Sequence, residues 1–195
     1  LYQIENSNLA QTAEFKADGS SNTDSSIKVL SGSTKSKGVE LDITARPTEG
    51  LSIIAGYSYN DMRYTKTSGI EGSFIVGDRL TRTPANTANL SFFYTLPSGV
   101  LKDVSFGATT NYIGKRVGGW NNQYKATEPN GILDREIPLE GYTSIDLSAG
   151  YKWKQFSILC KLSNITNELN YTVHENYSVN PIAPRQVMTS LKYKF

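Results

Sequence analysis

Apolar and polar residues alternate along most of this chain, and this period of two is the feature that most restricts its fold. Successive side chains of a β-strand point to opposite faces, so alternation indicates a strand with one apolar and one polar face. Val39, Leu41 and Ile43 form one such apolar set, and Glu40 and Asp42 stand between them. The pattern predicts an all-β protein made of antiparallel strands.

The same alternation recurs in later segments and is clearest in the last one, which continues to Phe195. With a weaker first strand near Tyr2 and Ile4, we expect about eight strands. The alternating segments are residues 38–46, 51–60, 88–96, 104–112, 144–151, 156–163 and 187–195. Ile54, Phe93 and Leu159 break the rule, and their parity places them on the polar face.

The connections between these segments alternate in length. Residues 47–50, 97–99 and 152–155 form short turns, whereas residues 66–80, 113–138 and 171–183 form long polar loops. The sheet is therefore expected to carry short turns at one edge and long loops at the other.

Composition excludes several classes of protein. Net charge is only +2, from 20 basic and 18 acidic residues mixed along the chain, so we expect no nucleic-acid partner. The single cysteine, Cys160, cannot form an internal disulfide, and no Cys/His cluster predicts a metal site or a cofactor. No apolar stretch reaches the ~20 residues of a membrane helix, and the first residues do not resemble a signal peptide.

A soluble β-sandwich also shows alternation, so a further feature is needed to favour a membrane barrel. None of the apolar faces carries a charge, and aromatic residues gather near the strand ends, as in the interfacial girdles of membrane barrels. A soluble carbohydrate- or protein-binding sandwich stays open as a weaker alternative. The girdle residues are Tyr57, Tyr59 and Tyr112 toward the long loops, and Tyr94, Tyr151, Trp153, Phe156, Tyr193 and Phe195 toward the short turns.

Several stretches closely resemble TonB-dependent siderophore receptors, most of all in the last third of the chain. They are residues 141–151 (GYTSIDLSAGY), residues 162–167 (LSNITN) with Tyr171, Pro184-Arg185, and residues 192–195 (KYKF) at the end. Residues 37–41 (KGVEL) and 55–59 (AGYSY) resemble the same family earlier in the barrel.

The resemblance implies a barrel of about 22 transmembrane strands whose lumen is plugged by an N-terminal domain. Residues 1–195 would then be a C-terminal segment of the barrel, with the plug domain and the earlier strands absent. The alternative is a self-contained eight-stranded outer-membrane barrel with a structural or adhesive role, because about eight strands can close by themselves.

The resemblance further implies a non-enzymatic receptor that binds and imports a ferric siderophore. Family members also carry cobalamin, haem, other metals and glycans, so the chelate stays open. The implied partners are a TonB-type energy-coupling complex acting through the plug, outer-membrane lipid and the barrel-assembly machinery. The implied location is the outer membrane of a Gram-negative bacterium, with the long loops extracellular and the C-terminus periplasmic.

Candidate ligand residues lie in the two last long loops, where Trp and Tyr offer flat contact area and Arg pairs with anionic oxygens of an iron chelate. The plainer alternative is that these side chains only pack the loops. The candidates are Arg116, Trp120, Asn121, Asn122, Tyr124, His174, Tyr177 and Arg185. Leu191, Tyr193 and Phe195 resemble the alternating signal read by the assembly machinery.

His174 is the only histidine, and a lone histidine makes a poor metal site. A surface hydrolase using His174 with Ser178 and Glu175 is a remote alternative, because adjacency in sequence does not create a catalytic triad. We therefore expect no catalytic residues. Cys160 falls on an apolar face and is expected to be a small buried apolar residue.

Overall fold

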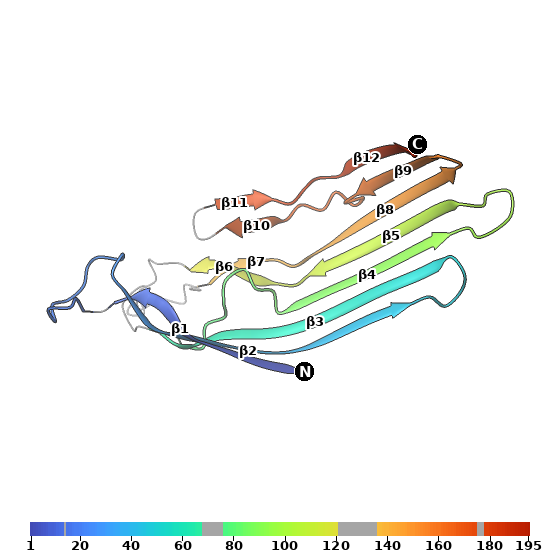
Figure 1. The fold of residues 1–195 in the computed structure, drawn as a ribbon. Coiled ribbons are helices and arrows are strands. Elements are labelled where there is room, and N and C mark those ends of the chain that lie inside the picture. The colour runs from blue at the N-terminus through green and yellow to red at the C-terminus, as the bar shows by residue number, and fades with distance from the viewer. Residues whose placement is uncertain (14, 68–75, 121–135, 175–177) are drawn as a thin grey trace. The chain divides into compact units, whose positions relative to one another are not determined.

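The computed structural model describes residues 1–13, 15–67, 76–120, 136–174 and 178–195, and within them it is all-β (Figure 1). No helix in these residues is long and apolar enough to cross a membrane. The strands are β1 (Tyr2–Thr12), β2 (Lys28–Ala45), β3 (Leu51–Lys66), β4 (Asn86–Thr95), β5 (Val104–Ile113), β6 (Arg116–Trp120), β7 (Glu136–Leu139), β8 (Tyr142–Trp153), β9 (Phe156–Ser163), β10 (Tyr171–His174), β11 (Ser178–Pro181) and β12 (Gln186–Tyr193).

Eight of these strands form one sheet, in the order β1-β2-β3-β4-β5-β8-β9-β12. The other four form two small hairpins, β6-β7 and β10-β11. Strands that follow one another in the main sheet are antiparallel wherever their register is defined. The predicted all-β class and the expected number of main strands are confirmed.

The chain divides into two compact units, which are described separately. Unit 1 contains residues 1–39, 59–85 and 116–139, and it holds β1, the first part of β2, the end of β3 and the β6-β7 hairpin. Unit 2 contains residues 40–58, 86–115 and 140–195, and it holds β4, β5, β8, β9 and β12 with the three short turns.

The apolar face of unit 2 is a single layer that no other part of the unit covers. Ala108 lies opposite Leu147, which lies opposite Leu162 on the next strand, and these residues line a hollow of about 490 Å³ together with Phe92 and Phe106. Leu147 remains 42% exposed and Phe106 52%. Among the described residues of the whole chain, the buried apolar side chains are only Ala13 and Val117. A soluble sandwich would bury this face, so the exposure favours a lipid-covered sheet.

The polar face of unit 2 contains the predicted exceptions to the alternation. Phe93 and Leu159 line a second hollow on this side, with Ser105, Ser148 and the Asp146–Lys161 ion pair. Gly107 makes room for the Phe93 ring, because a Cβ at Gly107 would lie 2.9 Å from a ring carbon. The expected orientation of Phe93 and Leu159 is therefore confirmed.

Several sequence-based expectations about the bounds of elements and loops are corrected. β1 is a full strand of 11 residues, β2 begins at Lys28 rather than near Gly38, and β3 continues to Lys66. The long loops at 113–138 and 171–183 contain the two small hairpins, and a long connection at 13–27 was missed. These segments are too short, or carry too few apolar residues, for alternation of hydrophobicity to reveal them.

Cys160 lines the hollow on the apolar face but is exposed, so the expectation of a buried cysteine is wrong within the described residues. The reason is that its face has no protein layer over it. Thr189 lies beside it, with its hydroxyl 3.8 Å from Cys160 Sγ.

Candidate functional site

The β6-β7 hairpin of unit 1 is held at its base by backbone contacts. Arg116 pairs with Leu139, and Trp120 pairs with Glu136 at the far end of the described hairpin. Val117 is buried, and its carbonyl oxygen accepts a hydrogen bond of 2.7 Å from the Arg82 backbone N–H. This bond joins the hairpin to the segment between β3 and β4.

The β10-β11 hairpin of unit 2 is anchored by Asn170, which is buried. Its side-chain Nδ2 donates to the Glu140 carbonyl at 3.1 Å, and its own carbonyl accepts from the Ile182 N–H at 2.9 Å. His174 pairs with Ser178 at the other end of the described hairpin. The anchor therefore presents the His174 end away from the main strands.

Asn164 connects the ends of β9 and β12 in unit 2. Its side-chain nitrogen donates to the carbonyls of Glu168 and Ala183, both at 3.0 Å, and its side-chain oxygen accepts from the Glu168 N–H at 2.9 Å. Its backbone N–H donates to Asp146 at 2.9 Å, and Asp146 also pairs with Lys161 at 2.7 Å. Asn164 is 5% exposed with a φ of 49°, a left-handed conformation that asparagine tolerates better than most residues.

Arg185 is part of this same junction. Its backbone N–H donates to Asn167 Oδ1 at 3.0 Å, and its guanidinium lies 3.4 Å from the Ile165 carbonyl. The residue stays exposed, so it supports the loop base while its charge is accessible to solvent.

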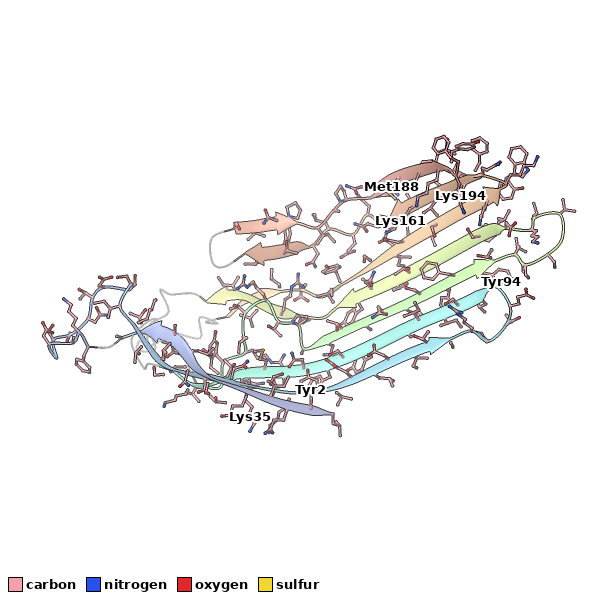
Figure 2. The ribbon with its side chains drawn as sticks, viewed as in Figure 1. Tyr2, Lys35, Tyr94, Lys161, Met188 and Lys194 are labelled. Atoms are coloured by element: carbon pink, nitrogen blue, oxygen red, sulfur yellow. The ribbon has the colours of Figure 1, made fainter. Side chains whose placement is uncertain are left out.

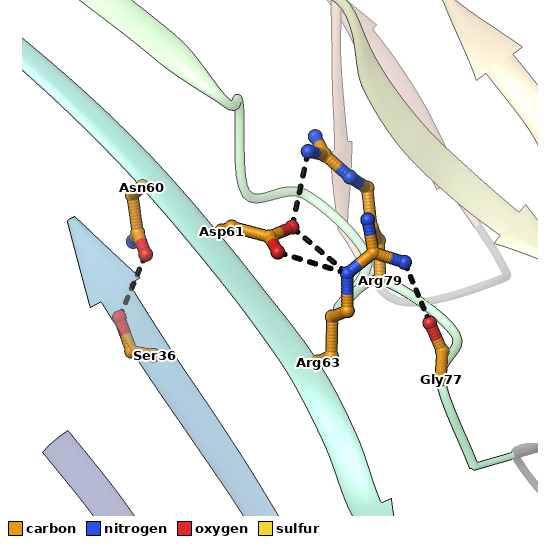
Figure 3. Close-up of polar contacts among 6 residues, drawn as sticks. All are labelled: Ser36, Asn60, Asp61, Arg63, Gly77 and Arg79. Atoms are coloured by element: carbon orange, nitrogen blue, oxygen red, sulfur yellow. Dashed lines mark hydrogen bonds and ion pairs between the residues drawn. The ribbon is translucent and has the colours of Figure 1, made fainter. Parts of the chain in front are cut away.

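Unit 1 contains a polar cluster that the sequence analysis missed: Asp61, Arg63, Gly77 and Arg79 (Figure 3). Asp61 accepts from Arg63 Nε at 2.9 Å and from Arg79 at 3.1 Å, and Arg63 donates to the Gly77 carbonyl at 2.8 Å. The hydrogen bond from Arg63, together with the charges of both arginines, holds the pKa of Asp61 below its usual value even though burial opposes this. The cluster fastens residues 77–79 to β3. The sequence contained a signal for this cluster. Asp61 and Arg63 occupy the alternate positions that follow Tyr57 and Tyr59, so the face changes there from aromatic to charged.

Comparison with known families agrees with this geometry. Residues 1–167 match the family of TonB-dependent receptor-like β-barrels, which is most of the chain. The chain belongs to this family.

Similar proteins include siderophore receptors. The ferrioxamine B receptor of Salmonella typhimurium strain SL1344 is 28% identical over 123 residues, which cover 62% of this chain and 15% of that protein. An uncharacterised TonB-dependent receptor of Haemophilus influenzae is 24% identical over 202 residues, covering all of this chain and 54% of that protein. The solved ferripyoverdine receptor of the Pseudomonas aeruginosa outer membrane, bound to ferripyoverdine, has a TM-score of 0.74 at 23% identity, covering 99% of this chain and 24% of that receptor.

These matches establish the fold of a TonB-dependent outer-membrane β-barrel and support an outer-membrane location. The chain spans about half of the Haemophilus protein and about a quarter of the Pseudomonas receptor. The soluble sandwich alternative is thereby set aside in favour of this family.

Within this receptor segment, the structure describes only part of the predicted ligand set. Arg116 and Trp120 belong to unit 1, and His174 and Arg185 belong to unit 2. Asn121, Asn122, Tyr124 and Tyr177 lie outside the described residues, as does Glu175 of the hydrolase alternative. In the part of the chain that is described, no three His, Cys, Asp or Glu side chains converge as metal ligands.

The aromatic residues of the receptor's last strands form a continuous cluster at the short-turn end of unit 2. The ring centroids of Trp153 and Phe156 are 6.3 Å apart, those of Phe156 and Tyr193 4.8 Å, and those of Tyr193 and Phe195 5.0 Å. Tyr94 lies at the same end, on β4 (Figure 2). These side chains are exposed, as expected of a girdle that meets lipid headgroups.

Proposed function

We propose that this chain is a C-terminal part of the barrel wall of a TonB-dependent outer-membrane receptor that binds and imports a ferric siderophore without covalent chemistry. The observation that carries the proposal is the family match over residues 1–167, joined to relatives named as siderophore receptors. The chain's share of the solved ferripyoverdine receptor, 24%, supports a larger parent with an N-terminal plug and further strands.

The ligand contacts are assigned to the loop hairpins. Trp120 and His174 stand at the far ends of the described hairpins, Arg116 at the base of one, and Arg185 at the base of the other. Asn121, Asn122, Tyr124 and Tyr177 complete the proposed set. An exposed guanidinium suits the anionic oxygens of an iron chelate, and aromatic rings add contact area.

The proposed orientation puts the long loops outside the cell and the C-terminus in the periplasm. The proposed partners are the TonB-type complex, acting through the plug, and the barrel-assembly machinery, reading Leu191, Tyr193 and Phe195. The alternative of a closed eight-stranded barrel requires β1 to pair with β12. It is less well supported, because these are the edge strands of the described sheet.

The test replaces residues 116–139 and 171–183 of the intact receptor with Gly/Ser segments of equal length. Binding of radioiron-labelled siderophores, including ferrioxamine B and ferripyoverdine, is measured on whole cells. We expect affinity to fall at least about tenfold, because a few contacts usually dominate binding. The control replaces the short turn at 97–99 and should keep affinity. Unchanged binding after loop replacement would refute the ligand assignment.

A further inference from the structure

Two lysines of β2, Lys35 and Lys37, lie just beyond the apolar part of the sheet in unit 1. The hydroxyl of Ser36 is bonded to Asn60 Oδ1 at 2.7 Å, which sets these two antiparallel strands side by side (Figure 3). Since alternate residues share a face, Lys35 and Lys37 lie on the face of β2 opposite to Ser36, and Tyr59 and Asp61 lie on the same side of the sheet on β3. Both lysines therefore share the face of Val39 and Tyr59, which are 40% and 38% exposed.

The other neighbour, β1, points to the same face. Gln3 pairs with Lys37, and Glu5 pairs with Lys35. By the same parity, Tyr2 pairs with Gly38 on the opposite face, where its ring lies over that glycine. Figure 2 labels Lys35 and Tyr2 on these two strands. The outer end of this face thus carries ammonium groups, while the apolar residues follow directly on β2.

The charge of this patch is positive overall. Lys35, Lys37, Arg63 and Arg79 are cationic, and Glu5 and Asp61 are anionic. Asp61 is already held by Arg63 and Arg79, at 2.9 and 3.1 Å. Within the described residues, neither lysine makes an ion pair or a hydrogen bond. Lys35 and Lys37 are therefore available to an external anion.

Distance along the strand identifies the environment of these ammonium groups. At about 3.4 Å per residue, Lys37 is about 7 Å and Lys35 about 14 Å along the strand from Val39, and a strand tilt of about 40° reduces these distances to about 5 and 11 Å along the membrane normal. The headgroup layer on each side of the hydrocarbon core is about 5–8 Å thick. Lys37 therefore falls at the headgroup level, and the flexible stem of Lys35 reaches back toward it.

We propose that Lys35 and Lys37 form a binding site for the phosphorylated headgroup of a membrane lipid, whose acyl chains begin at the level of Val39, with Tyr59 at the interface. Anionic headgroups attract basic residues that border a lipid-covered surface. The Asp61–Arg63–Arg79 cluster holds the neighbouring part of β3 and its loop in place. This role is independent of siderophore binding, and it uses the face opposite to Tyr2 and Ser36.

The test uses the intact receptor purified in detergent and bisphosphorylated lipid A as the probe. Native mass spectrometry measures how much lipid stays bound to the wild type and to the Lys35→Gln/Lys37→Gln variant. We expect the affinity to fall about tenfold, because each basic residue near an anionic surface contributes about fivefold and Glu5 offsets part of this. The Lys35→Arg/Lys37→Arg variant should retain binding, and heat-modifiable migration of all variants checks folding.

Lys152→Gln/Lys192→Gln is the matched control, because both lysines flank Ser157 on the polar face and should not affect lipid retention. Equal retention by wild type and the Lys35/Lys37 double glutamine variant would overturn the proposal. So would equal binding of dephosphorylated lipid A, which would indicate apolar contact alone. Inorganic phosphate that binds as tightly as the lipid would indicate a free-anion site and would overturn the assignment to lipid.

Discussion

Single polar residues determine how the strand ends are connected in this receptor segment. The LSNITN stretch resembles the family in sequence, and the structure gives a physical reason for its asparagines. Asn164 satisfies part-buried backbone groups on both sides of the junction, while Asn167 accepts the Arg185 N–H. Both asparagines have positive φ, 49° and 53°. The motif that resembles the receptor family is therefore a loop anchor.

We predict that Asn164→Ala lowers the free energy of unfolding by about 3 kcal/mol, because it leaves several part-buried backbone groups without partners. Urea unfolding of the receptor in lipid vesicles measures the change. Thr166→Ala is the control, since its hydroxyl contacts Asn164 at only 3.5 Å and its loss should cost less than about 0.5 kcal/mol. A cost for Asn164→Ala as small as this would contradict the anchor.

The strands of this sheet differ from those of a soluble β-protein in the environment that each of their two faces meets. Leu147 and Leu159 are both 42% exposed, yet parity places them on opposite sides of unit 2. Leu147 lines the hollow of the apolar face, whereas Leu159 lies with Ser105 and Lys161 on the polar face. The exposed fraction alone does not distinguish these two positions. They differ in the cost of a charged side chain, which is high on the face that meets lipid and low on the polar face.

We predict that Leu147→Lys costs about 2–4 kcal/mol in a bilayer, because a charge on the lipid face of a barrel loses its hydration. Leu159→Lys should cost less than about 1 kcal/mol, because its face carries polar and charged groups already. Folding into vesicles with increasing urea compares the two variants directly. Equal costs would mean that both faces of β8 and β9 meet the same solvent.

At the scale of the whole molecule, the proposed receptor requires this set of strands to be inserted into the membrane and joined to further strands. The last strand, β12, pairs only with β9 in the described sheet, and its aromatic end extends the cluster of Trp153 and Phe156. Tyr193 and Phe195 are 48% and 108% exposed, so little of this segment is committed to packing. Such an exposed, alternating end is suited to recognition during assembly.

We predict that Tyr193→Ala/Phe195→Ala reduces the amount of folded receptor in the outer membrane several-fold, because both the proposed assembly signal and interfacial aromatic contacts are lost. Heat-modifiable migration in gels separates folded from unfolded receptor. Lys192→Ala/Lys194→Ala, on the alternate positions of the same segment, serves as the control. Equal yields for the two double variants would argue against an alternating signal.

The sequence by itself determined the strands that cross the lipid layer. Alternation survives wherever one face meets lipid and the other meets water, so segments such as 88–96 and 144–151 were predicted from hydrophobicity alone. Parity also predicted the polar-face positions of Phe93 and Leu159. Local patterns suffice here because the membrane imposes the same requirement on every residue of the strand.

Only the tertiary structure decided what happens beyond the lipid layer. The extension of β2 to Lys28, the small hairpins and the Asp61–Arg63–Arg79 cluster carry too few apolar residues, or are too short, for a regular alternation to mark them. Their form depends on hydrogen bonds between distant residues, such as Arg82 with Val117 and Asn170 with Glu140. These hydrogen bonds produce no periodic pattern in the sequence, because at least one partner in each is a backbone group, which every residue carries.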